Sequence, residues 1–289
     1  MPSRAVVDPS PPHAAHRSPL VALASLAAGS PPKEAIVAAL ELRPLSTGEI
    51  LDGALTLLRR HFRLLFAIAV VCEGVPTVIE LYLEVMGGGR VDPMSGLIIR
   101  ILNAVGNVLV TGATVRAVSE AYLGGVPRLG EVLRYAAGKV GLIFGALFLS
   151  GLVTFLAALA IVIPGIIVFC GYSVAGQVAA LEPLSGSTDA LRRSWALTKG
   201  FKGKALVLWI VSFAIALALV IGAGALGAAA GAIAGALDAT VTVLVAVVSL
   251  LMYPLITCVF TLFYYDLRVR KEGFDLEVLS RQLGSGQGA

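Results

Sequence analysis

The side chains best suited to chemistry in this chain are a few ionisable and amide groups inside long apolar segments. Glu73 lies in the first of these segments, and Asn103, Asn107, Arg116 and Glu120 lie in the second. A charged or amide group is costly at membrane depth, so it normally faces the interior of a helix bundle or a wet cavity. These five residues therefore predict an intramembrane polar cluster.

Two interpretations of this cluster remain open. In the first, it lines the path or binding site of a small transporter. In the second it is structural, with an ion pair between Glu73 and Arg116 and hydrogen bonds between helices. One face of the second segment is polar at steps of three and four residues, which favours a bundle interior or a cavity: Arg100, Asn103, Asn107, Thr111 and Thr114.

No catalytic motif accompanies the cluster. The sequence contains no HExxH, no GxSxG, no paired aspartates and no P-loop. The three cysteines fall in different apolar segments without CxxC spacing, which is typical of small core residues: Cys72, Cys170 and Cys258. The histidines lie outside these segments: His13, His16 and His61. We therefore expect no enzymatic activity, no cofactor and no metal site.

The composition indicates a membrane protein. Of the 289 residues, 57% are hydrophobic and only 14% are charged, far from the mixture of a soluble domain. The mean hydropathy is +0.90. A net charge of +4 is modest, and basic loops are expected in a membrane protein, so it does not indicate a nucleic-acid partner.

Six helical spans are expected, because a membrane crossing needs about 20 mostly apolar residues. The first three run over about 64–83, 97–123 and 140–163, and the fourth follows directly and ends at about 181. The fifth begins at about 206 and runs into a glycine- and alanine-rich segment, and the sixth runs over about 241–265. Pro76 should kink the first span. Pro164 and Gly165 should form the turn between the third and fourth spans, which makes these two spans antiparallel neighbours.

A short amphipathic segment precedes each pair of spans. The first should begin at a capping box in which Ser46 and Glu49 satisfy each other's backbone N–H groups. Similar segments start at 48, 130 and 188, each with an acidic residue two positions before a leucine. The predicted fold class is therefore all-α, with three hairpins that each follow an interfacial helix. The alternative is that three short matches arise from capping preferences alone.

Basic residues predict the orientation. Of 22 lysines and arginines, only Arg90 and Arg100 lie near the turns after the first, third and fifth spans. Basic loops stay in the cytoplasm, so we expect a multi-pass protein of the cell inner (cytoplasmic) membrane with both termini cytoplasmic.

The basic residues of the amphipathic segments are candidate contacts for anionic lipid headgroups, each contributing about 1 kcal/mol near a charged surface. The alternative is that their charges only fix the topology. With one tryptophan suited to the headgroup layer, the candidates are Arg59, Arg60, Arg63, Arg192, Arg193, Trp195, Lys199, Lys202 and Lys204.

Glycines recur every four residues at the end of the fifth span, at Gly227, Gly231 and Gly235. This spacing lets two helix backbones approach closely in lipid. It predicts either close packing within the chain or a seam between chains, as in a homo-oligomer or with another membrane partner.

We divide the chain into a disordered or loosely helical cytoplasmic arm, 1–42, a six-span membrane domain, 43–273, and a short cytoplasmic tail, 274–289. Four motifs occur in order: 43–52 (RPLSTGEILD), 163–166 (IPGI), 191–200 (LRRSWALTKG) and 264–276 (YYDLRVRKEGFDL). Together they resemble the membrane domain fused to some bacterial glycerophosphoryl diester phosphodiesterases, over residues 43 to about 280.

The resemblance implies a helical membrane domain and no catalytic residue, since the phosphodiesterase chemistry belongs to a separate barrel of about 250 residues that has no room here. The expected role is a non-catalytic membrane scaffold or anchor that acts with a partner or with anionic lipid. The alternative is a small transporter or permease component with a polar site around Glu73 and Arg116.

Overall fold

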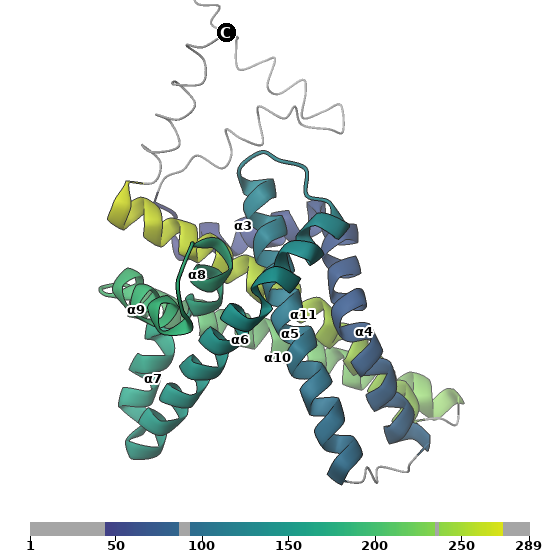
Figure 1. The fold of residues 1–289 in the computed structure, drawn as a ribbon. Coiled ribbons are helices and arrows are strands. Elements are labelled where there is room, and N and C mark those ends of the chain that lie inside the picture. The colour runs from purple at the N-terminus through teal and green to yellow at the C-terminus, as the bar shows by residue number, and fades with distance from the viewer. Residues whose placement is uncertain (1–43, 87–92, 235–236, 274–289) are drawn as a thin grey trace, which may run out of the picture. The chain divides into compact units, whose positions relative to one another are not determined.

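The computed structural model describes residues 44–86, 93–234 and 237–273, and all regular structure in these ranges is helical (Figure 1). The predicted arm and tail lie outside them. Six described segments are long and apolar enough to cross a membrane: Phe62–Leu83, Pro93–Tyr122, Leu129–Ala160, Val162–Leu181, Lys202–Ile233 and Thr240–Glu272. The chain is an all-α, multi-pass membrane protein, as its composition predicts.

The first helix, α3 (Thr47–Arg60), begins at the predicted capping box. The Glu49 backbone N–H donates to Ser46 Oγ at 3.3 Å, and the Ser46 N–H donates to Glu49 Oε2 at 2.7 Å. This helix is amphipathic and lies against the bundle. Its buried residues are Ile50, Ala54 and Leu57.

The next two helices form the first hairpin, α4 (Phe62–Met86) and α5 (Pro93–Tyr122). Pro76 lies inside α4, which continues past it. The two helices approach closely at Gly106, where an added Cβ would lie 2.6 Å from the Cys72 carbonyl oxygen. This close approach requires glycine and places the middle of α4 directly against α5.

The second hairpin departs from the prediction of a separate interfacial helix. Residues 130–139 are the first turns of one continuous helix, α6 (Leu129–Ala160). The reason is local: the stretch between Glu131 and Val140 contains no proline and no Ser, Thr, Asp or Asn, and its one glycine, Gly138, keeps a helical conformation. By contrast, α3 ends at His61. The expected unit of interfacial helix and hairpin is therefore complete at the first and third hairpins and wrong at the second.

The predicted turn at Pro164 and Gly165 is also wrong. The chain reverses at Ile161, which is extended, and both residues belong to the first turns of α7 (Val162–Gly171). Proline suits the start of a helix because the N–H that it lacks has no partner there. Gly165 allows close packing of the hairpin, since an added Cβ would lie 2.6 Å from Ala158 Cα.

The fourth span is a broken helix. After α7, residues 172–174 form a turn, and the span resumes as α8 (Ala175–Leu181). The break exposes the carbonyl oxygen of Gly171, which accepts hydrogen bonds from the hydroxyls of Ser194 and Thr198, both at 3.0 Å. Breaks at membrane depth are tolerated where neighbouring side chains satisfy the freed backbone groups.

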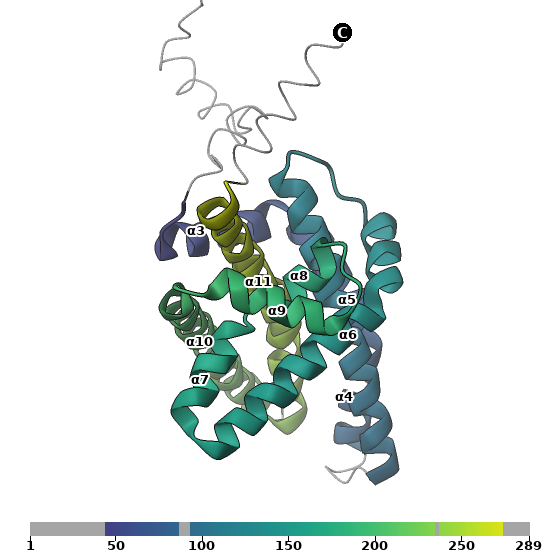
Figure 2. The same ribbon diagram turned by 60° about the vertical axis from the view of Figure 1, so that its left-hand side comes forward.

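Those two hydroxyls belong to α9 (Ser187–Thr198), the predicted amphipathic helix of the third hairpin. It lies across α6 and α8 (Figure 2). Gly200 follows it with a φ of 90°, a left-handed conformation that favours glycine at a helix end. Helix α10 (Lys202–Ala234) then enters the fifth span.

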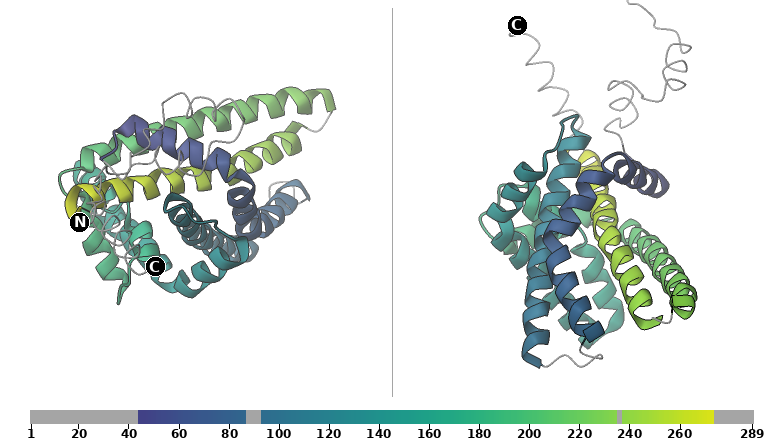
Figure 3. Two further views of the ribbon diagram at one scale, coloured as in Figure 1. Left: turned by 90° about the horizontal axis from the view of Figure 1, so that it is seen from above. Right: turned by 90° about the vertical axis from the view of Figure 1, so that its right-hand side faces the viewer.

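The last helix, α11 (Leu237–Glu272), is the centre of the fold. It packs along α10 and also contacts α3, α4 and α5, and Figure 3 shows α10 and α11 side by side with α3 across them. Every residue from 257 to 267 is buried. Large aromatic side chains fill this core: Phe260, Phe263 and Tyr264.

The glycine series of the fifth span packs within the chain where it is described. An added Cβ at Gly227 would lie 2.7 Å from Val241 Cα, so this glycine lets α10 approach α11. Gly231 is buried, and Gly235 lies outside the described residues. A seam to another chain stays a prediction.

Candidate binding site within the membrane

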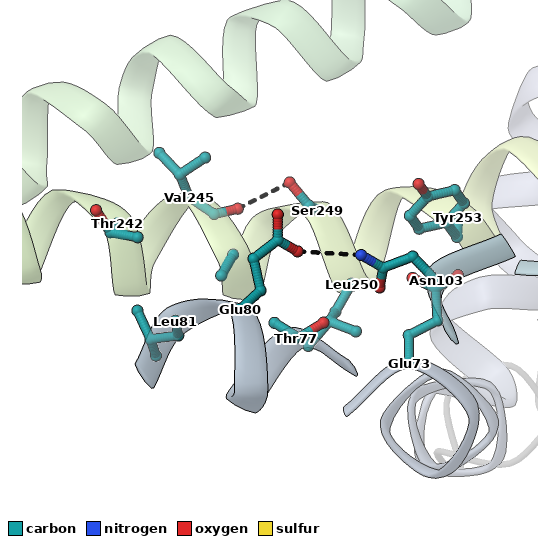
Figure 4. Close-up of a pocket in the computed structure, with 11 residues that line it drawn as sticks. Glu73, Thr77, Glu80, Leu81, Asn103, Thr242, Val245, Ser249, Leu250 and Tyr253 are labelled. Carbon is teal, nitrogen blue, oxygen red and sulfur yellow. Dashed lines mark hydrogen bonds between the residues drawn. The ribbon is translucent and has the colours of Figure 1, made fainter. Parts of the chain in front are cut away.

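A cavity of about 400 Å³ lies between α4, α5 and α11 (Figure 4). We call it the acidic cavity, because two carboxylates line it, those of Glu73 and Glu80. Its other polar lining residues carry hydroxyl or amide groups: Thr77, Asn103, Thr242, Ser249 and Tyr253.

The carboxylates come from one face of α4. Glu73, Thr77 and Glu80 follow one another at steps of four and three residues, which places them on the same side of a helix. The seven residues between the two glutamates correspond to about 10 Å along the helix axis. Glu80 accepts a hydrogen bond from Asn103 Nδ2 at 3.1 Å (Figure 4).

Glu73 is the unusual residue of this cavity. Its exposed fraction is only 6%, yet no hydrogen bond or ion pair joins it to any residue that the structure describes. A buried carboxylate normally has a counter-charge or several donors, because burial without them is strongly unfavourable. Glu73 thus presents an acidic group to the cavity with no protein partner among the described residues.

The opposite wall comes from α11. Ser249 donates a hydrogen bond to the Val245 carbonyl oxygen at 2.9 Å, which leaves its hydroxyl oxygen available as an acceptor (Figure 4). Tyr253 follows one turn later. These two walls and Asn103 of α5 together supply carboxylate, hydroxyl and amide oxygens, a chemistry that suits a cation.

A second cavity of about 620 Å³ adjoins the first and shares Tyr253 with it. It lies between α5, α6, the break after α7, α10 and α11. No Asp, Glu, Lys or Arg lines it. We call it the aromatic cavity, because its lining includes Phe155, Phe169, Tyr172, Trp209, Tyr253 and Phe260.

The rings of the aromatic cavity pack on one another. The Trp209 ring lies 4.8 Å from that of Phe169 and 4.5 Å from that of Phe260, centroid to centroid. Trp209 Nε1 and Ser173 Oγ are buried without a hydrogen-bond partner among the described residues. The cavity is therefore aromatic and uncharged, and hydroxyl and amide groups also line it: Asn107, Thr111, Ser150, Thr154, Ser173, Gln177 and Thr257.

The predicted polar cluster is only partly brought together. Glu73 and Asn103 line the acidic cavity, and Asn107 lines the aromatic cavity. Arg116 and Glu120 line neither. The ion pair expected between Glu73 and Arg116 is wrong: Arg116 Nε donates to Glu120 Oε1 at 2.6 Å, because a partner one turn away on α5 is closer.

Two predicted lipid contacts form internal ion pairs instead of lying free. Arg193 binds Glu182 at 2.9 Å and Glu272 at 2.5 Å. Burial opposes its charge, but the hydrogen bonds and charges of both glutamates outweigh burial and raise the pKa of Arg193. Lys204 donates to Asp266 Oδ2 at 2.6 Å and to the Leu45 carbonyl oxygen.

Most of the remaining predicted basic contacts are exposed: Arg59, Arg60, Arg63, Arg192 and Lys199. Lys202 Nζ lies 3.2 Å from the centre of the Trp195 ring, a cation–π contact. Trp195 also lines a notch of about 370 Å³, together with Val168, Tyr172, Leu191 and Arg192. We call it the α7–α9 notch.

The sequence contained a signal for part of what the prediction missed. Thr77 and Glu80 lie on the face of α4 that Glu73 marks, so helical periodicity alone extends the acidic group to Glu80. Ser249 and Tyr253 are likewise one turn apart on α11. Nothing local indicates that these two faces meet, since α4 and α11 are far apart in the sequence.

Comparison of the chain with protein families, with curated proteins and with solved structures finds no match.

Proposed function

We propose that this integral membrane protein binds a cation in the acidic cavity and acts as a small transporter or a permease component. The observation that carries the proposal is Glu73: a carboxylate at membrane depth, 6% exposed, lining a cavity of about 400 Å³ and unpaired among the described residues. Ionisable residues in such positions commonly belong to binding sites or conduction paths.

The donor set favours a monovalent or organic cation. Among the described residues, no group of three or more His, Cys, Asp or Glu side chains is placed to hold a metal ion. Glu73 and Glu80 instead lie at two depths, with hydroxyl and amide oxygens between and opposite them. A positive charge beside Glu73 would provide the counter-charge that the surrounding protein does not supply.

The test is binding of tetramethylammonium to the full chain in lipid nanodiscs. We expect Glu73→Gln to weaken binding by at least about 10-fold, since a contact with a charged group contributes about 1.5–3 kcal/mol. The matched control is Glu131→Gln, because Glu131 is exposed and pairs at 3.6 Å with Arg128, away from the cavity. Equal affinity in wild type and Glu73→Gln, or no binding to either, would overturn the proposal.

A second candidate function, a membrane scaffold that holds anionic lipid, is supported by the α7–α9 notch. Arg192 is exposed there beside Trp195 and Tyr172, and no ion pair or hydrogen bond joins it to a described residue. An arginine above apolar side chains and interfacial rings suits an anionic headgroup with its acyl chain. This role agrees with the resemblance to the phosphodiesterase-linked membrane domain. It also agrees with a cytoplasmic location of both termini, which is a further part of the proposal.

The lipid role is tested by the phosphatidylglycerol that the detergent-extracted full chain retains in native mass spectrometry. We expect Arg192→Gln to weaken retention roughly fivefold, which corresponds to about 1 kcal/mol for one arginine at a charged surface. Arg134→Gln is the control, because Arg134 is exposed on α6 and does not line the notch. Equal retention by both variants would contradict the role.

A further inference from the structure

The acidic and aromatic cavities are neighbours that meet at one residue. Tyr253 lines both. On α5, Asn103 lines the first and Asn107, one turn later, lines the second. On α11, Ser249 and Thr257 flank Tyr253 in the same order. Two helices, α5 and α11, therefore contribute side chains to both cavities.

The two cavities differ in chemistry. Two carboxylates line the acidic cavity, whereas the lining of the aromatic cavity contains no charged residue and six aromatic rings. The volumes, about 400 and 620 Å³, each fall within the range of small-molecule sites, roughly 300–1,000 Å³. A small inorganic cation would use only the acidic cavity.

We propose that the ligand is an amphipathic organic cation whose ammonium group lies beside Glu73 and whose apolar body occupies the aromatic cavity. This inference rests on the proposed cation-binding function and names its substrate class. The carboxylate selects the charge, and burial of the apolar body against Phe155, Trp209 and Phe260 supplies affinity in proportion to its area.

Chain-length dependence of binding tests the substrate class. The probes are tetramethylammonium, butyltrimethylammonium and hexyltrimethylammonium, titrated into nanodiscs that carry the full chain, with empty nanodiscs to subtract partition into lipid. We expect affinity to rise roughly three- to fourfold per methylene. Glu73→Gln should weaken all three probes by the same factor, because they share the charged group.

Two variants on α6 test the place of the apolar body without disturbing the core. Gly151 lines the aromatic cavity, and a Cβ there meets nothing within 4 Å, so Gly151→Phe should fill the cavity and abolish the chain-length gain. Tetramethylammonium should bind it as it binds wild type. Gly141→Phe is the control, since Gly141 is equally open and lies outside the cavity.

Phe155→Ala should reduce the gain in affinity with chain length. Phe148→Ala should not, because Phe148 is exposed on the same helix and lies outside the cavity.

The outcomes separate the two proposals. A wild-type affinity independent of chain length, with Glu73→Gln still weakening binding, would overturn the amphipathic substrate and leave cation binding intact. A chain-length gain that Gly151→Phe keeps would also overturn it. If Glu73→Gln changes no affinity, both proposals fall.

Discussion

At the scale of single residues, two buried carboxylates have opposite surroundings. Asp266 is 1% exposed and accepts from the Leu45 N–H at 2.7 Å, from Lys204 Nζ at 2.6 Å and from Arg270 Nε at 2.9 Å. Glu73 is almost as buried and has no described partner. The first arrangement fastens the start of α3 to α10 and α11. The second, a buried carboxylate without a described partner, lowers stability and is typical of a binding site.

Asp266→Ala is expected to lower the free energy of unfolding by about 3–5 kcal/mol, because it leaves the Lys204 side chain, only 14% exposed, without its counter-charge. Denaturant unfolding of the detergent-solubilised chain measures this. Adding Lys204→Met should recover part of the loss, since the pair is then removed together. Glu131→Ala removes an exposed ion pair and should lower the free energy of unfolding by no more than about 1 kcal/mol. An equally small decrease in Asp266→Ala would contradict the structural role of Asp266.

Glu73→Gln is expected to leave the unfolding free energy unchanged or to raise it by about 1 kcal/mol, because it removes a buried charge that has no protein partner in the described structure. The same denaturant measurement applies. A clear destabilisation would mean that Glu73 has a structural partner, and it would argue against the acidic cavity as a binding site.

His61 gives a pH dependence whose sign follows from its surroundings. Burial and the neighbouring charge of Arg60 lower the pKa of His61 below its ordinary value. The folded state therefore binds fewer protons than the unfolded state, and stability is lost as the pH falls below about 6.5 toward the folded pKa. Melting temperatures across this range should fall less in His61→Gln than in wild type, and parallel curves would contradict the assignment.

At the scale of helices, α9 holds the broken fourth span together. Ser194 and Thr198 satisfy the Gly171 carbonyl oxygen, and the Trp195 ring packs against Gly171 itself. Because Tyr172 and Ser173 of this break line the aromatic cavity, α9 positions one wall of it from outside.

Gly171→Ala is expected to destabilise the chain by about 1–3 kcal/mol, because the new methyl group would overlap the six-membered ring of Trp195. Thermal unfolding in detergent measures the change. Gly141→Ala provides the control, as its added methyl group meets nothing within 4 Å and alanine favours a helix. Equal melting temperatures in the two variants would show that α9 does not press on the break.

Local chemistry predicts helices well and their connections less well. The capping box at Ser46 and the glycine end of α9 were predictable because each uses neighbours within a few residues. The turn at Ile161 was not predictable, because a Pro-Gly pair suits both a turn and the start of a helix. The sequence alone does not separate these two uses. The break at 172–174 depends on α9, which lies later in the chain.

At the scale of the whole molecule, six spans follow from composition, but the two cavities do not. Their walls join α4 to α11 and α5 to α6, α10 and α11, and no local pattern specifies which spans are neighbours. Glu73 and Asn103 were predictable as cavity-lining residues because they are polar at membrane depth. The aromatic lining was not, since apolar rings are ordinary in a span.

The topology is tested by labelling single cysteines in a chain whose natural cysteines are replaced. Gly125→Cys and Gly186→Cys lie at connections on one side, and Ile161→Cys lies at the opposite end of α6. With both termini cytoplasmic, a membrane-impermeant maleimide added to spheroplasts should label only Ile161→Cys, and permeabilised cells should show all three. Labelling of Gly125→Cys in intact spheroplasts would contradict the orientation.

The tip of the α6–α7 hairpin contacts little except itself. Residues 158–164 are all exposed, whereas Gly165 is buried and lies close to Ala158. Lipid tails do not discriminate among Leu, Ile, Val and Phe as a packed core does. Homologues should therefore exchange the apolar residues at positions 159–163 freely while keeping Gly165. The aromatic residues at the end of α11 should vary much less.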